Sequence, residues 1–119
     1  MRIKTADAGK FIANLCPFTA GNLRGDGVGV LSAPPATGAL PAELAAGLRD
    51  AQMRLTQDYL AGSGARDAVP DAPAYIVSSY GTPIAWVTHA RKVVIPDVTY
   101  SSTTTRHQRV VREALAARP

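Results

Sequence analysis

The 119-residue chain has one cysteine, few aromatic residues and no apolar run long enough to cross a membrane. The lone Cys16 excludes an internal disulfide and a cysteine-based metal cluster, and we expect it to be a small buried apolar residue. Because aromatic residues make up only 6% of the chain, the core must depend on Ala, Val, Leu and Ile. No cationic and then apolar segment opens the sequence, so we expect a cytoplasmic protein without membrane contact.

The remaining composition is that of an ordinary globular protein. Apolar residues are 46% and charged residues 18%, which argues against wholesale disorder. The length predicts a single domain over residues 1–119 with one modest core. Within it we expect a helical, Gly/Pro-rich N-terminal part at residues 1–66 and a unit of three strands and a helix at residues 74–117.

The net charge of +4 is unevenly distributed along the chain. From Arg91 onward the sequence has six basic and two acidic residues, so this C-terminal segment accounts for the whole excess of positive charge. A basic surface attracts phosphate backbones, anionic lipid or acidic proteins. The alternative is a basic face that is merely solvated.

Two helices are expected in the N-terminal half. A short one at residues 5–15 ends before Pro17, because proline cannot continue the backbone ladder. The second starts at Pro41, ends at Gly62, and has an apolar face with a period of three to four residues. Residues 18–38 are rich in Gly and Pro, and we expect a loop there with at most one edge strand, over residues 25–31. The run Gly25–Gly29 lacks the Gly-Lys-Ser/Thr ending of a phosphate-binding loop.

Three β-like runs follow, at residues 74–80, 82–88 and 92–96. Short connections between them favour antiparallel pairing. Alternation predicts that Ile84 and Trp86 share one face, and we expect Trp86 to be buried. The fold class that we predict is α+β: a three-stranded antiparallel sheet with two or three helices packed on one face.

The last helix follows the sheet directly. Thr105 and Gln108 match a capping box, so we expect the helix to begin between Ser102 and Arg106. Val111 and Leu115 lie on an apolar stripe that predicts packing against the sheet, with the arginines turned away from it.

Hydroxyl groups and positive charges crowd at the start of this helix. Exposed N–H groups, hydroxyl donors and guanidinium groups can together bind a phosphate group by hydrogen bonds and charge. The alternative is a well-capped helix with no ligand, since Ser and Thr are also favoured there for structural reasons. The predicted nucleic-acid or anion-binding residues are Arg91, Lys92, Ser102, Thr103, Thr104, Arg106 and Arg109.

No catalytic or metal-binding signature stands out. His107 lies near hydroxyl residues as a hydrolytic base would, but it falls on the apolar stripe, which favours a packed histidine with one satisfied nitrogen. The two histidines and Asp97 lack a paired ligand spacing. We therefore expect a non-enzymatic protein without metal or cofactor. Among the aromatic residues, Tyr80 and Tyr100 stay open as base-stacking candidates.

Residues 79–108 carry a distinctive string. Ser79-Tyr80-Gly81-Thr82-Pro83-Ile84-Ala85-Trp86 is followed by Tyr100-Ser101 and then by Thr103-Thr104-Thr105-Arg106-His107-Gln108. The string resembles a small, uncharacterised actinobacteriophage protein family with the pattern Ser-Tyr-x-Thr-Pro-Ile-Ala-Trp … Tyr-Ser-x-Thr-Thr-Ser/Thr-Arg/Lys-His-Gln. Gly81 and Thr105 differ from its usual residues. The resemblance implies a phage protein that acts in the host cytoplasm, and it implies no catalytic residues.

Two functions from different classes remain. The first is a small accessory or regulatory protein that binds nucleic acid through the basic C-terminal helix. The second is a phage protein that binds and modulates a host protein. They differ in their response to salt, because phosphate contacts weaken steeply as counterions accumulate and an apolar contact does not.

Overall fold

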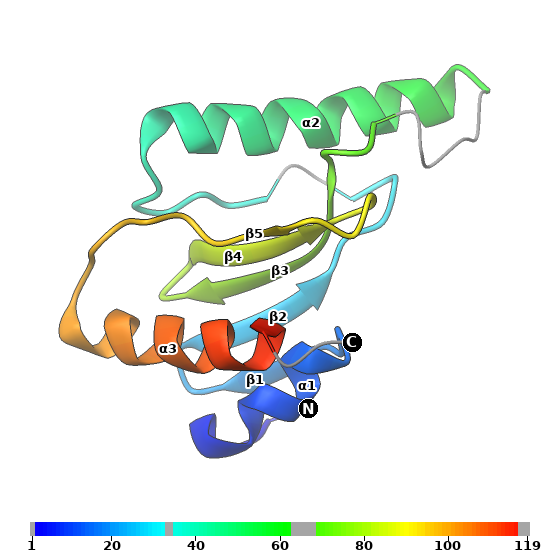
Figure 1. Cartoon of the computed structure of the whole chain (residues 1–119). Helices are drawn as coiled ribbons and strands as arrows, with labels where there is room; N and C mark the ends of the chain where they lie inside the picture. The colour runs from blue at the N-terminus through cyan, green and yellow to red at the C-terminus, as the bar shows by residue number, and fades with distance from the viewer. Residues whose placement is uncertain (1, 33–34, 63–68, 117–119) are drawn as a thin grey trace.

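The computed structural model describes residues 2–32, 35–62 and 69–116 (Figure 1). Its middle layer is a five-stranded antiparallel sheet with the strands in sequence order, where the sequence predicts three strands. The α+β class is confirmed. The strands are β1 (Phe18–Ala20), β2 (Leu23–Gly27), β3 (Pro73–Ser79), β4 (Thr82–Thr88) and β5 (Val93–Val94). The helices are the 3₁₀ helix η1 (Thr5–Asp7), α1 (Ala8–Ala13), α2 (Ala42–Leu60) and α3 (Ser102–Ala116).

The two additional strands, β1 and β2, come from the glycine-rich segment. They form a hairpin, and β2 pairs with β3 along all five of its residues. Gly25 lies where a Cβ atom would collide with the Tyr75 hydroxyl and the Phe18 ring, so a glycine is required in the middle of β2. The strand predicted over residues 25–31 is right only in part. Residues 25–27 lie in β2, which is an inner strand and not an edge, whereas residues 28–31 lie outside the strands and Leu31 is 61% exposed.

Helices cover both faces of the sheet, so the prediction of a single covered face is wrong. Tyr75 and Val77 pack with Val111 of α3, whereas Ile76 and Trp86 pack with Leu48 of α2. Figure 1 shows α2 on one side of the sheet and α1 and α3 on the other. Every residue of β4 is buried, as expected for a strand between two helical layers.

A bulge in β4 changes which side chains share a face. Val77 pairs with Ala85 and Ser78 pairs with Pro83, so Ile84 has no partner on β3. Ile84 and Ala85 both join the core on the α3 side, while Trp86 packs on the α2 side. The predicted shared face of Ile84 and Trp86 is therefore wrong, but the predicted burial of Trp86 is confirmed by its 6% exposure.

The N-terminal helix α1 packs directly on α3. Ile12 lies in one core with Val111, Ala114 and Leu115, which confirms the predicted apolar stripe of the last helix. Cys16, expected to be buried, is exposed. Its thiol donates a hydrogen bond to the Asn14 carbonyl at 3.6 Å, and its own carbonyl accepts a 2.8 Å hydrogen bond from the Tyr75 hydroxyl. No helix in the described part of the chain is long and apolar enough to cross a bilayer.

Candidate functional site

The start of α3 is capped by Ser101, one residue before the helix. Its Oγ accepts a hydrogen bond of 3.2 Å from the Thr104 N–H, and its carbonyl accepts the Thr105 N–H at 2.9 Å. The predicted capping box is wrong because Thr105 is already inside the helix. Gln108 instead donates its Nε2 hydrogen to the Val98 carbonyl at 2.9 Å, which attaches the preceding segment to α3.

A buried polar cluster joins α3 to the end of β3. The Ser79 Oγ lies 2.7 Å from His107 Nδ1 and 3.2 Å from Thr104 Oγ1. All three side chains are buried, and burial lowers the pKa of His107. A serine that is hydrogen-bonded to a histidine also resembles a catalytic nucleophile with its general base. Ser79 is only 1% exposed, however, so its hydroxyl is not accessible to a substrate in this structure. The packed histidine with one satisfied nitrogen, favoured from the sequence, is what the structure shows.

The lowered pKa of His107 predicts a loss of stability in mild acid. The unfolded chain takes up a proton near pH 6.5, whereas the folded state resists it until the pH falls further. The contribution of neutral His107 is therefore complete above about pH 6.5 and is lost as the pH falls through the lowered folded value. We expect the denaturation midpoint of the protein to fall between pH 7 and pH 5, and His107→Gln to flatten that dependence.

The matched control for this measurement is His89→Gln, at the other histidine of the chain. It measures how much of the pH dependence comes from the second imidazole. An equally steep acid response in His107→Gln would show that the buried imidazole is not the group responsible.

The outer face of α3 carries three exposed arginines, Arg106, Arg109 and Arg112, spaced three residues apart. Within residues 2–32, 35–62 and 69–116, none of them forms an ion pair. Ser102 and Thr103 are exposed in the first turn of the same helix. With Glu113 as its one acidic residue, α3 has a net charge of +2. We define Arg106, Arg109 and Arg112 as the arginine face, which is exposed to solvent.

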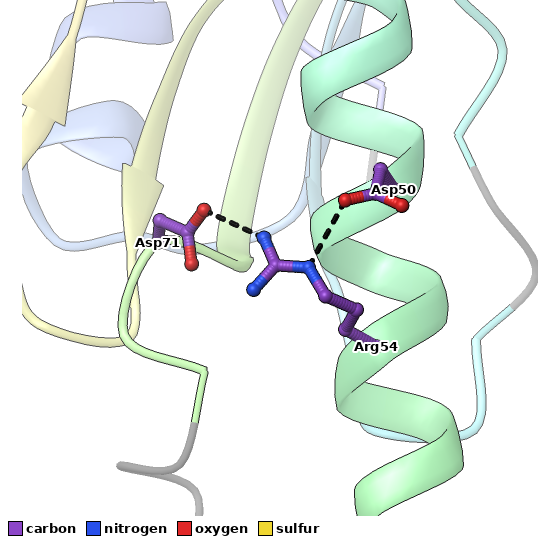
Figure 2. A network of polar contacts seen from close by, with 3 residues as sticks. All are labelled: Asp50, Arg54 and Asp71. Atoms are coloured by element: carbon purple, nitrogen blue, oxygen red, sulfur yellow. Dashed lines mark hydrogen bonds and ion pairs between the residues drawn. The ribbon is translucent and has the colours of Figure 1, made fainter.

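The helix on the opposite face of the sheet differs in its charges. α2 contains three acidic and two basic residues, so its net charge is −1. Its Arg54 is neutralised within the protein, as Figure 2 shows: Nε lies 3.0 Å from Asp50 on the same helix, and Nη2 lies 3.0 Å from Asp71 before β3. The unpaired positive charge of the helices is therefore concentrated on the α3 side.

The structure separates the predicted binding residues into two places. Arg91 and Lys92 follow the end of β4 at Thr88, whereas the start of α3 contacts Ser79 beside the other end of that strand. Arg106, Arg109, Ser102 and Thr103 remain together on α3. Thr104 is buried, and its hydroxyl accepts a hydrogen bond from the hydroxyl of the capping residue Ser101.

The sequence did not predict the hollows around this helix start. One of about 440 Å³ is lined by Ser101, Thr104, Tyr80 and Tyr100, among others. The Tyr100 hydroxyl is buried without a hydrogen-bond partner among the described residues, and burial raises its pKa. No group of three His, Cys, Asp or Glu side chains in the described ranges is arranged to hold a metal ion.

Comparison with known proteins places part of this architecture in a family. A family of unknown function, DUF8033, matches residues 43–117, which is more than half of the chain. The chain belongs to this family. The DUF8033 match covers nearly all of α2, strands β3 to β5 and α3, and therefore includes the arginine face. No curated protein and no solved structure matches the chain.

Proposed function

We propose that this is a small, non-enzymatic accessory protein that binds nucleic acid, with the arginine face of α3 as its phosphate-contacting surface. The observation that carries the proposal is the set of three exposed arginines on one helix with no intramolecular ion pair among the described residues. Guanidinium groups free of carboxylates can release counterions from a phosphate backbone, which is the main source of sequence-independent affinity.

Neighbouring features support the same face. α1 packs against α3, and its Lys10 is exposed, which adds a positive charge to this helical layer. Ser102 and Thr103 supply hydroxyl donors in the first turn, where backbone N–H groups also suit an anion. The resemblance of residues 79–108 to an actinobacteriophage family supports a role for the protein in a phage-infected host cell.

Removal of two arginines from this face should weaken binding to all sequences alike. Arg106→Ala combined with Arg109→Ala removes two phosphate contacts, so we expect the slope of log affinity against log salt to flatten by about two units. The measurement is fluorescence anisotropy with labelled duplex DNA, duplex RNA and single strands across a salt series.

Two controls distinguish a specific binding site from general electrostatic attraction to the basic protein. Arg91→Ala with Lys92→Ala removes the same charge from the distant β4–β5 turn, and Arg49→Ala removes an exposed arginine from α2. Both should bind like the wild type. An equal loss in the β4–β5 variant would contradict a specific α3 interface, and a wild type that binds no nucleic acid at low salt would contradict the proposed function.

A second candidate function, binding to a host protein, has its own structural support. A groove of about 410 Å³ between α2 and the short edge strand β5 is lined by Leu44, Leu48, Trp86 and Val94. Val93 on this edge is exposed, and an open strand edge can pair with an extended segment of a partner. This candidate predicts a complex with a protein from nuclease-treated host lysate that persists at high salt and is lost in Val93→Lys.

A further inference from the structure

Tyr80 is held in a conformation that is unfavourable for its residue type. It forms the two-residue β3–β4 turn with Gly81, and both residues have positive φ, 52° and 79°. Hairpin turns of this length favour Asn or Asp at the first position, since the left-handed region is costly for a residue with a Cβ atom. The turn is held in place by the Tyr80 N–H, which donates to the Asn22 carbonyl of the neighbouring hairpin at 2.9 Å. Strain of this kind concentrates at functional sites.

The strained tyrosine presents its ring to solvent. Tyr80 is 55% exposed, although it lies in a turn between two buried strands. The His107 ring lies against it with centroids 6.2 Å apart and planes inclined by 25°. Contact with His107 supports one side of the ring, and the exposed remainder is available to a partner.

Tyr80 also lines a groove of about 550 Å³ on the α2 face of the sheet. The floor of this groove includes Arg24 and Ser78, which are paired across β2 and β3. Arg24 makes a surface ion pair with Asp26, but its side chain is still 65% exposed. The groove therefore offers hydrogen-bond donors and acceptors beside an exposed aromatic ring.

Tyr80 lies beside both this groove and the start of α3. His107, on which the ring stacks, is the neighbour of Arg106 in α3. Tyr80 lines the hollow at the start of α3 as well as the groove on the sheet. Tyr80 thus lies between the groove on the α2 face of the sheet and the hollow at the start of α3, the helix that carries the arginine face.

We propose that Tyr80 is a base-stacking platform and that the ligand of this protein is single-stranded nucleic acid. An unpaired base stacks on the tyrosine ring, while the adjacent phosphates contact Arg106 and the start of α3. A duplex does not offer this contact, because its base faces are covered by their neighbours in the helix. Stacking on an aromatic ring beside positive charge is the usual means of binding single strands without sequence preference. The inference rests on the proposed function and adds the class of nucleic acid.

The test uses 2-aminopurine, whose fluorescence is quenched when it stacks on an aromatic ring. The full chain is titrated into a short single strand that carries this base, and into the matching duplex. The test variant is Tyr80→Asn, because asparagine tolerates positive φ and the turn keeps its shape without the ring. We expect about tenfold weaker binding to the single strand and loss of the protein-induced quenching, with duplex binding unchanged. Tyr80→Phe should bind like the wild type.

The controls distinguish this inference from the proposed function. Tyr59→Ala removes another exposed tyrosine from α2 and should change nothing, and thermal unfolding of Tyr80→Asn should show a folded protein at least as stable as the wild type. If Tyr80→Asn binds single strands like the wild type while the Arg106/Arg109 variant binds weakly, the platform is refuted and the α3 interface stands. If the wild type binds no nucleic acid at all, both proposals are refuted.

Discussion

Replacing Gly25 by alanine is expected to destabilise the protein by about 3 kcal/mol, the upper end of the range for overpacking a core. A Cβ atom at this position would collide with the Tyr75 hydroxyl and with two atoms of the Phe18 ring. Both partners are almost completely buried, so neither ring can swing into solvent to make room. The displaced Tyr75 hydroxyl would also lose its hydrogen bond to the Cys16 carbonyl.

Chemical denaturation of Gly25→Ala beside Gly27→Ala measures this effect. Gly27 lies two residues further along the same strand and points to the same side of it, but nothing lies within 4 Å of its Cβ position. We expect Gly27→Ala to be close to wild type in stability. Similar free energies of unfolding for the two variants would show that close packing is not the reason for a glycine at position 25.

Leu115→Ala is expected to cost roughly 2–5 kcal/mol in the free energy of unfolding. Leu115 is buried in the last turns of α3, in the same core cluster as Ile12 of α1 and Val87 of β4. Alanine would leave a cavity between the two helices and the sheet, because these elements are too rigidly paired to collapse into it.

The comparison variant is Leu60→Ala at the end of α2, where the leucine is 70% exposed. It makes the same chemical change without opening a cavity and should alter the denaturation midpoint little. A loss below about 0.5 kcal/mol in Leu115→Ala would contradict the packing of α3 on the sheet.

The elements with regular apolar periods were predictable from the sequence. The period of three to four residues after Pro41 predicted α2, which begins at Ala42 and ends at Leu60. Apolar runs around a Gly-containing turn predicted β3 and β4, and the stripe at Val111 and Leu115 predicted α3. In each of these segments local propensity and tertiary packing agree, so short-range patterns were sufficient.

The strands β1 and β2 were not predictable in the same way. β1 has only three residues, and β2 contains two glycines and a charged pair, which is the composition of a loop. Their conformation depends on pairing with β3, which is about 50 residues further along the chain. From the sequence, Gly25 is one of several glycines in an irregular segment; the structure shows that the Phe18 and Tyr75 rings leave no room for a Cβ atom there.

The candidate interface was predicted in part. The excess of positive charge after residue 90 pointed to α3, where the arginines are exposed and unpaired among the described residues. The same count also included Arg91 and Lys92. In the fold these two residues follow the Thr88 end of β4, whereas the start of α3 lies near its Thr82 end. A charge count along the chain does not record which residues share a surface.

By itself, the sequence determined the α+β class, the helices α2 and α3, the strands β3 and β4, and an arginine-rich outer face on the last helix. These depend on periodicity and on residues close together in the chain, which a linear pattern records. Only the tertiary structure decided the two additional strands, the helices on both faces of the sheet, and the position of Tyr80 between His107 and the groove. They depend on pairing and packing between residues far apart in the chain, and no local pattern contains that information.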